Sequence, residues 1–344
     1  MDSHQSPSSP TPFARPSPSP SDNVSGTDVV NPTASESSSI APRPRRIWPV
    51  FLVIAASLGT YMVASAAAFL LAIFLVTGQL SLDQLRDPDT AISVTESRLG
   101  FPIVVVLPQF ALIAPCIIAA WLSPVGFANR LGLRRGNWPY WAWVSAMLAT
   151  PLVGMTSGLV GGLFFEESDH LRELTRIFRQ HGTDGFLIPL ALMIGATPAI
   201  CEELLFRGYV QTRLTDSLGR WFGRRITFPV GRAIGALLGL IIASLVFAAF
   251  HMDPVHVVTV FPIGLFLGWV AYQSGSIYPA MLGHFANNTL SVVITVLAPE
   301  EMPDTLALPS VMFAFAIFSA GMLGLAGSVL ASLLFSQRPD HELI

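Results

Sequence analysis

The sequence predicts an all-α protein, a polytopic bundle of about eight transmembrane helices with a disordered N-terminal tail. Its 344 residues are 52% hydrophobic and only 12% charged, whereas a soluble domain carries about 25% charged residues. Eight apolar stretches are long enough to cross about 30 Å of hydrocarbon at about 1.5 Å per residue. Residues 1–46 have a different composition from all that follows.

The N-terminal segment 1–46 is rich in Ser, Pro and Thr and holds few large apolar residues. Such a composition cannot bury enough surface to offset its ordering entropy, so we expect a disordered cytoplasmic tail. A protein-binding arm is the alternative, and composition alone favours a solvated tail. A transmembrane helical domain is expected over 47–335, followed by a short C-terminal tail over 336–344.

The apolar stretches set the expected order of the helices. They run approximately over 47–80, 101–123, 138–165, 186–209, 233–251, 257–275, 277–298 and 307–335. The first and last are long enough to tilt or to extend beyond the bilayer. No internal repeat is evident, which gives no support to a transporter built from repeated halves.

Arginine placement predicts the orientation, because cytoplasmic loops of membrane proteins carry an excess of basic residues. Arginines precede the first span and follow the second, fourth and eighth, which favours an inner- or plasma-membrane protein with both termini cytoplasmic. These are Arg43, Arg45, Arg46, Arg130, Arg134, Arg135, Arg213, Arg220, Arg224, Arg225, Arg232 and Arg338. The loop with Arg172, Arg176 and Arg179 breaks the pattern, although acidic residues accompany it.

Charge and cysteine content exclude two other classes. A net charge of −3 gives no reason to expect a nucleic-acid partner. The two cysteines, Cys116 and Cys201, both lie in apolar segments, so no disulfide framework is expected.

The segment Glu202-Glu203-Leu204-Leu205-Phe206-Arg207 places three charged residues in an apolar stretch. Ionised side chains at such depth cost at least a few kcal/mol and are usually retained for function. Residues four apart share a helix face, so Arg207 is expected to pair with Glu203. Glu202, rotated by about 100°, is left to face a cavity. A buried, unpaired carboxyl group suits a residue that takes and returns a proton. The alternative is an ion-pair cluster that only locks helices together.

Two later apolar stretches carry further polar side chains. His251 ends the fifth stretch, four residues after Phe247. Nearby His256 is interpreted as a residue at the membrane interface. In the seventh stretch, His284 and Asn288 are four apart and therefore project from one helix face. An interhelical hydrogen bond worth about 1 kcal/mol is the alternative for that pair.

Together these residues supply what peptide hydrolysis requires, a base that activates water and donors for the developing oxyanion. Glu202 with His251 could hold and deprotonate water, and His284 with Asn288 could stabilise the oxyanion. In a second scheme, Glu202, His251 and His284 coordinate Zn²⁺ and leave one position for water. The His-Glu-x-x-His signature of many zinc proteases is not present, and direct activation by Glu and His is favoured.

These three motifs resemble those of the CPBP (CAAX-processing and bacteriocin-processing, or Abi) family of membrane proteases. The matching segments are Glu-Glu-x-x-x-Arg at 202–207, Phe-x-x-x-His at 247–251 and His-x-x-x-Asn at 284–288. The resemblance covers about 186–292, with a weaker echo in Gly-Leu-Arg-Arg at 132–135. It implies that Glu202 is the base and positions water with His251. It further implies support from Glu203 and Arg207 and an oxyanion site at His284 and Asn288.

The leading prediction is an intramembrane endopeptidase that cuts near the carboxyl end of a membrane-associated protein or peptide from the cytoplasmic side. A prenylated CAAX-type protein is one candidate substrate, since some members of the family process such proteins. A membrane scaffold or a peptide-immunity protein is the non-catalytic alternative. A proton-coupled transporter is the third, because buried Glu and His side chains can relay protons.

The predicted spans conflict with this chemistry in one respect. They place Glu202 near the cytoplasmic end of the fourth helix and His251 at the outer end of the fifth, up to about 20 Å apart at about 1.5 Å per residue. We therefore expect the true helix bounds to differ. Either the fourth helix is broken near Pro198 or it is displaced, and residues 220–232 are helical or partly embedded.

Overall fold

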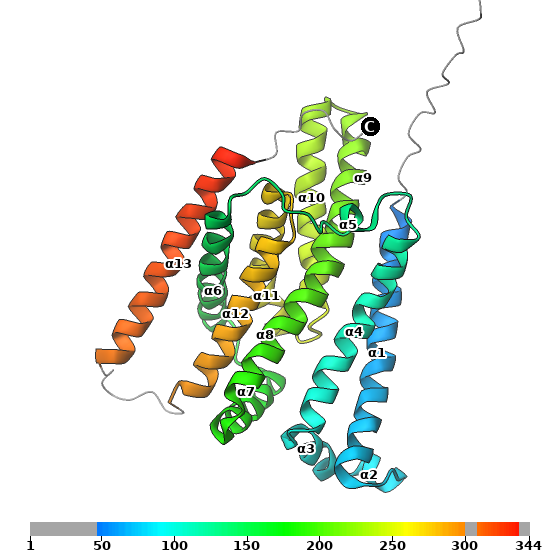
Figure 1. The fold of residues 1–344 in the computed structure, drawn as a ribbon, viewed down its shortest axis with the longest axis vertical. Coiled ribbons are helices and arrows are strands. Elements are labelled where there is room, and N and C mark those ends of the chain that lie inside the picture. The colour runs from blue at the N-terminus through cyan, green and yellow to red at the C-terminus, as the bar shows by residue number, and fades with distance from the viewer. Residues whose placement is uncertain (1–46, 300–307, 337–344) are drawn as a thin grey trace, which may run out of the picture. The chain divides into compact units, whose positions relative to one another are not determined.

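The structure, a computed structural model, describes residues 47–299 and 308–336. The tail predicted over 1–46 and all but the first residue of that predicted over 336–344 lie outside these ranges. Within the described residues the chain is helical, with thirteen α-helices, two π-helical segments and no strand (Figure 1). The elements are α1 (Trp48–Thr77), α2 (Leu82–Arg86), α3 (Pro88–Glu96), α4 (Gly100–Trp121), α5 (Phe127–Arg130), α6 (Tyr140–Gly162), α7 (Asp169–His181), η1 (Gly182–Phe186), α8 (Leu187–Glu203), η2 (Leu204–Gln211), α9 (Thr212–Gly223), α10 (Phe228–Ala249), α11 (Pro254–Ser274), α12 (Tyr278–Leu297) and α13 (Leu308–Phe335).

Eight helices in the described part of the chain are long and apolar enough to cross a membrane. They are α1, α4, α6, the continuous run from α7 to α9, α10, α11, α12 and α13. The predicted class, an all-α bundle with about eight membrane spans, is confirmed, and the protein is a multi-pass integral membrane protein. The largest difference lies in the fourth span, which belongs to a helical run of 55 residues, Asp169–Gly223, with a kink at Gly185, where φ is 82°.

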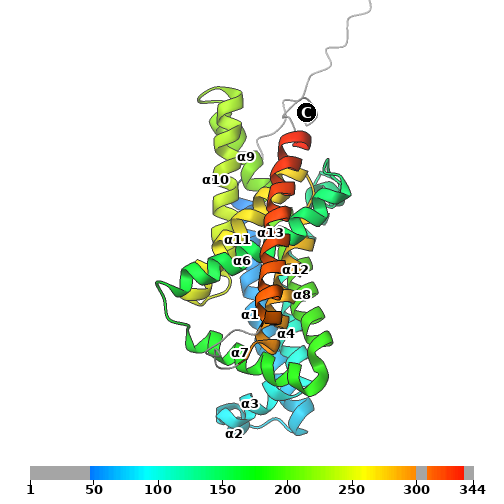
Figure 2. The same cartoon turned by 90° about the vertical axis from the view of Figure 1, so that its left-hand side faces the viewer.

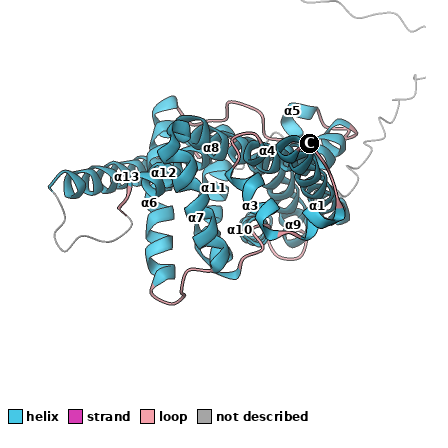
Figure 3. Cartoon of the chain, turned by 90° about the horizontal axis from the view of Figure 1, so that it is seen from below, coloured by secondary structure: helices cyan, strands magenta, loops and turns pink. Residues whose placement is uncertain are grey.

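The membrane helices pack in two rows. Neighbours in the first row follow the order α13, α6, α12, α8, α4 and α1, as Figures 1 and 3 show. In the second row α11 packs against α6 and α10, and α10 packs against α9. The π-helical segment η2 contacts α4, α10 and α11, so it lies between the rows. The charged motif that ends α8 is therefore surrounded by helices on several sides.

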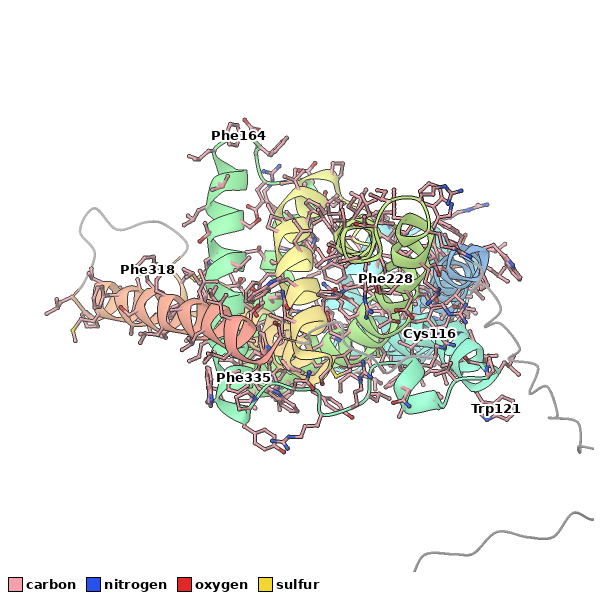
Figure 4. All side chains as sticks on the ribbon, turned by 90° about the horizontal axis from the view of Figure 1, so that it is seen from above. Cys116, Trp121, Phe164, Phe228, Phe318 and Phe335 are labelled. Carbon is pink, nitrogen blue, oxygen red and sulfur yellow. The ribbon has the colours of Figure 1, made fainter. Side chains whose placement is uncertain are left out.

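Aromatic side chains face outward around the bundle. Trp121, Phe164 and Phe318 are exposed, and Figure 4 shows them towards the edges of the view. Apolar surface of this extent on a bundle of membrane spans is suited to contact with lipid. Cys116, by contrast, is fully buried, and it and Cys201 are both free thiols.

A glycine-lined contact joins α9 to α10, which form the antiparallel hairpin at the top of Figures 1 and 2. Gly231, Gly235 and Gly239 recur every four residues along α10. A Cβ atom at Gly235 would overlap the backbone of Gly219 in α9. Small residues at this spacing let two helix backbones approach closely in a membrane. The close approach holds α10 alongside the helical run that carries Glu202.

The hairpin removes the conflict in the predicted spans. Residues 202–224 lead up to its turn and residues 227–251 lead back, so Glu202 and His251 lie at about the same height at about 1.5 Å per residue. The predicted bounds were wrong because the fourth helix continues well beyond residue 209. The helix is not broken at Pro198, which lies inside α8. The prediction that residues 220–232 are largely helical is confirmed, with a turn at 224–227.

The segment after Glu203 is not the regular α-helix that the sequence reading assumed. Residues Leu204–Gln211 form the π-helix η2, and all eight are buried. π-Helical segments are rare and often occur at functional sites. Two of the polar side chains of η2 bond to carbonyl groups of α11, Arg207 to Gly264 and Gln211 to Gly268. These bonds fix η2 against the second row of helices.

The arginines that break the charge pattern lie on α7, and described partners hold each of them. Arg172 pairs with Asp169, and Arg179 donates to the carbonyl of Ala298. Arg176 pairs with Glu173 and with Glu96 of α3, at 2.7 and 2.8 Å. The Arg176 guanidinium lowers the pKa of the Glu96 carboxyl group. Local partners therefore hold all three arginines, which remain an exception to the charge pattern.

Candidate active site

A buried charge network lies behind the site. Glu203, Arg207 and His284 are 0%, 1% and 4% exposed. Nη1 of Arg207 lies 2.8 Å from Oε1 of Glu203, the ion pair predicted from their four-residue spacing. Nδ1 of His284 lies 2.9 Å from the same carboxylate oxygen. Since a carboxylate can only accept, Nδ1 of His284 is the donor in this bond.

The phenyl ring of Phe247 separates the polar side chains of the site. Cζ of Arg207 lies 4.2 Å from the ring centroid, a cation–π contact. The rings of His251 and His284 lie edge-to-face against Phe247, at centroid distances of 5.4 and 5.8 Å. The Phe-x-x-x-His motif thus supplies an apolar wall between the two imidazoles as well as a histidine.

Glu202 turns away from this network and faces a cavity. Its Oε1 accepts a hydrogen bond of 3.3 Å from Nε2 of Gln109 on α4. Its Oε2 lies 3.9 Å from Nε2 of His284 and has no hydrogen-bond partner among the described residues. Glu203 is paired and Glu202 lines a cavity, as predicted, but Glu202 is not free, because Gln109 bonds to one of its oxygens.

The cavity has a volume of about 440 Å³ and is lined by both Glu202 and His251. Apolar side chains from several helices form much of its wall, together with polar residues near the α10–α11 turn. Its lining residues are Tyr61, Gln109, Leu112, His170, Leu174, Glu202, Phe206, Phe250, His251, Met252, Asp253 and His256. A concave, largely apolar site with a few convergent polar groups is typical of a substrate site.

His251 lies just beyond the end of α10. Its Nδ1 is 3.3 Å from the carbonyl oxygens of both Phe247 and Ala248, so Nδ1 donates and Nε2 is left as an acceptor. The following residue, Met252, has a φ of 57°, unusual for a residue other than glycine. This turn starts the loop to α11 and leaves the imidazole of His251 at the cavity wall.

His284 and Asn288 share one face of α12, as predicted, but they reach different partners. His284 bonds Glu203, whereas Nδ2 of Asn288 donates to the carbonyl of Ile194 in α8 at 3.3 Å. Oδ1 of Asn288 accepts a bond from Asn287. Neither His284 nor Asn288 lines the cavity. The structure thus gathers five of the six predicted residues around the cavity and its supporting network, with Asn288 held against α8.

The described side chains do not supply the ligands of the zinc scheme. Zinc sites in proteins use three or four ligands at about 2.0–2.3 Å. In the described ranges, no three side chains of His, Cys, Asp or Glu form a group that could hold a metal ion. Nδ1 of His284 donates to Glu203, and its Nε2 is 3.9 Å from Oε2 of Glu202, an arrangement that is itself compatible with ligation. Because no third ligand lies beside them among the described residues, the side chains do not fit a three-ligand zinc site.

Sequence reasoning missed several cavity residues. Gln109 was overlooked, although it is the only side-chain amide in the apolar helix α4. His256 was assigned to an interface, yet it lines the cavity with its ring centroid 4.5 Å from that of His251. His170 and Tyr61 come from distant elements, and no local pattern marks them as site residues.

The fold and the buried polar centre define a multi-pass membrane protein with a candidate hydrolytic site. Residues 184–290 match the family model described as Rce1-like, type II CAAX prenyl endopeptidase. The match spans about a third of the chain, includes all six predicted site residues and agrees with the predicted core over 186–292. Residues 184–290 are therefore similar to a domain of type II CAAX prenyl endopeptidases. Neither the comparison with curated proteins nor the one with solved structures gave a match.

Proposed function

We propose that this protein cleaves a peptide bond near the carboxyl end of a membrane-associated protein, with prenylated CAAX-type proteins as the substrate class. The observation that carries the proposal is the shared cavity of Glu202 and His251, next to the buried Glu203–Arg207–His284 network. The family match supports the same reaction class. Apolar residues of the cavity wall, such as Leu112 and Phe250, suit a substrate that arrives from the bilayer.

In the proposed reaction, Glu202 is the general base. Oε2 of Glu202 takes a proton from water as the water oxygen bonds to the substrate carbonyl carbon. Nε2 of His251 accepts the second hydrogen of that water and holds it in the cavity. When the tetrahedral intermediate collapses, the carbon–nitrogen bond breaks and Glu202 returns its proton to the leaving amine. The products are a carboxylic acid and a free amine.

His284 is the proposed donor to the oxyanion of the intermediate. In a doubly protonated imidazole both nitrogens donate. Nδ1 donates to Glu203, and Nε2, which lies 3.9 Å from Oε2 of Glu202, donates to the developing oxyanion. Asn288, on the same face of α12, is the second proposed donor, once its amide leaves the carbonyl of Ile194. Donors aimed at developing charge are worth most in a site that excludes water.

Glu203 and Arg207 have a supporting role in this scheme. Their ion pair supplies the carboxylate that orients His284, and the Arg207 guanidinium packs on Phe247 beside both imidazoles. We also propose that both termini face the cytoplasm, because most of the basic loops lie on that side in this orientation. The cavity would then receive its substrate from the cytoplasmic half of the bilayer.

The experiment uses the full chain, purified in detergent. Its probes are an internally quenched peptide that ends in a farnesylated CAAX sequence and the same peptide without the lipid. We expect cleavage of the farnesylated peptide, and loss of that cleavage in Glu202→Gln. Undiminished cleavage by Glu202→Gln would contradict the proposed base. Preference for the unlipidated peptide would contradict the proposed substrate class.

A further inference from the structure

Gln109 is a polar residue that neither the motifs nor the family match includes. It lies on α4, outside the matched residues 184–290. In Gly100–Trp121 it is the only side chain with an amide, hydroxyl or charged group. An amide inside an apolar membrane helix requires a partner, because an unsatisfied polar group in hydrocarbon is costly.

The partner of Gln109 is the proposed base itself. Nε2 of Gln109 donates to Oε1 of Glu202 at 3.3 Å, and both side chains line the same cavity. This bond joins α4, in one part of the chain, to the end of α8. A side chain that occupies one carboxylate oxygen fixes the carboxylate plane and leaves the other oxygen, Oε2, for a second donor.

Helix–helix adhesion alone accounts poorly for this residue. Oε1 of Gln109 is buried and has no hydrogen-bond partner among the described residues, and the same holds for Oε2 of Glu202. Leaving a buried acceptor unpaired costs about 1–3 kcal/mol, which offsets the gain from an interhelical bond. Both side chains line the cavity, although neither of these two atoms is itself exposed in this arrangement.

We infer that Gln109 is a positioning residue that holds the Glu202 carboxylate in the orientation needed to deprotonate water. The inference rests on the proposed role of Glu202 as the base. The amide of Gln109 holds Oε1, and Oε2 is left as the oxygen that takes the proton in the proposed reaction. Since the amide contributes no proton, its loss slows the chemical step without abolishing it.

The first test replaces Gln109 by methionine, a side chain of similar length with no hydrogen-bond donor. With the farnesylated CAAX peptide as probe, we expect Gln109→Met to lower kcat about 10- to 100-fold, the scale of a misplaced catalytic group. KM should stay within about twofold. Phe110→Leu is the matched control, because Phe110 is the next residue of α4 and is exposed. An unchanged kcat in Gln109→Met would overturn the inference.

A second variant separates positioning from structural support. Gln109→Glu keeps the shape of the side chain but loses the donor when the new carboxyl group is ionised. Two adjacent carboxylates then repel each other, and activity at neutral pH should fall. At lower pH the new carboxyl group is protonated and donates again, so the pH optimum should lie below that of the parent chain. A loss that is equal at all pH values would indicate a structural role only and would contradict the inference.

A third measurement needs no substrate and distinguishes failure of this inference from failure of the proposed function. The infrared carboxylate band of Glu202 is identified as the band that Glu202→Gln removes from the spectrum. We expect Gln109→Met to shift that band and Phe110→Leu to leave it in place. An unshifted band would overturn the inference, whatever the activity. A shifted band together with full peptide cleavage by Glu202→Gln would instead refute the proposed base and, with it, the catalytic consequence of Gln109.

Discussion

Two adjacent glutamates occupy opposite environments in this protein. Glu203 is fully buried, and its Oε1 lies within 3 Å of both Arg207 and His284. Glu202 lines a cavity of about 440 Å³ and keeps one oxygen without a hydrogen-bond partner among the described residues. One peptide unit separates them, and a rotation of about 100° about the helix axis determines which side each one faces.

This difference reflects two requirements of a polar site in a membrane, a stable fold and a group that can accept a proton. A carboxylate that is buried away from any cavity and held by an arginine is a poor base, because no water reaches it and the ion pair favours its charged form. A carboxylate with a free oxygen in a cavity can accept a proton, at some cost to stability. The buried network of Glu203, Arg207 and His284 is called the sealed network below. It meets the cavity side at His284, which bonds Glu203 and lies 3.9 Å from Glu202.

Glu202→Gln should have the largest effect on activity. Amide and carboxylate have almost the same shape, so the fold should persist while the base is lost. We expect a fall in kcat of about 100- to 10,000-fold, the usual contribution of general acid–base catalysis. Cleavage of the farnesylated peptide measures activity, and thermal unfolding in detergent measures the fold.

Glu167→Gln is the control for this prediction, because Glu167 is exposed and lies in a loop before α7. It should leave both measurements unchanged. A Glu202→Gln protein that unfolds well below the parent chain, with a loss of activity to match, would assign Glu202 to the sealed network instead.

Arg207→Met should have the largest effect on stability. It removes one partner of a buried ion pair and leaves the Glu203 carboxylate uncompensated, which costs about 3–5 kcal/mol of unfolding free energy. The double variant with Glu203→Gln should recover part of this loss, because no carboxylate is then left buried without its arginine. Chemical unfolding in mixed micelles measures the difference between the variants.

An exposed ion pair provides the comparison for Arg207. Arg172 and Asp169 lie 2.7 Å apart on the surface of α7. Pairs of this kind contribute about 0–1 kcal/mol, so Arg172→Met should change the unfolding free energy very little. Equal losses in Arg172→Met and Arg207→Met would refute the contrast between the sealed network and the surface.

The sequence predicted much of the sealed network and less of the cavity, for a physical reason. The Glu203–Arg207 pair follows from a four-residue spacing, and the shared face of His284 and Asn288 follows from the same rule. The cavity is built by side chains from several helices, and a single sequence carries no signal for which of them meet. Gln109 and His170 are the clearest examples, since each reaches the site from a separate element.

The sequence also did not predict where the helices near the site begin and end. Hydropathy ended the fourth span at residue 209 because polar residues follow, but those residues continue the run through η2 and α9. Glycines on α10 allow the close hairpin that brings His251 level with Glu202. Hydropathy averaged over a window of residues does not register glycines at a four-residue spacing. The sequence analysis therefore did not predict the α9–α10 hairpin, which brings His251 level with Glu202.

Asn288→Ala tests whether Asn288 acts with His284 in the proposed reaction. If Asn288 donates to the oxyanion, kcat should fall about 100-fold with little change in KM. Loss of the bond to Ile194 should cost only about 1 kcal/mol of stability. Asn287→Ala is the matched control on the adjacent position and should lower kcat less than about tenfold. A stability loss with full activity would assign Asn288 to helix packing alone.

Asp253, the second carboxylate that lines the cavity, should give the smallest effect. Its Oδ1 accepts a 2.7 Å bond from the backbone N–H of His256 and caps the start of α11. This bond, with a smaller contribution from a side-chain bond to Ser168, lowers the pKa of the Asp253 carboxyl group. Asp253→Ala should reduce the unfolding free energy at neutral pH by about 1 kcal/mol, the usual cost of losing an N-cap.

The pH dependence of that loss has a definite sign. A carboxyl group whose pKa is lower in the folded protein stabilises the fold above its unfolded pKa, and this contribution disappears as the pH falls through the folded value. The stability difference between the parent chain and Asp253→Ala should therefore shrink towards acidic pH. A difference that is constant from neutral pH to well below the folded pKa would show that the charge of Asp253 contributes nothing to the cap. The rim of the cavity would then owe its shape to packing, and Glu202 would be the only carboxylate there whose ionisation matters.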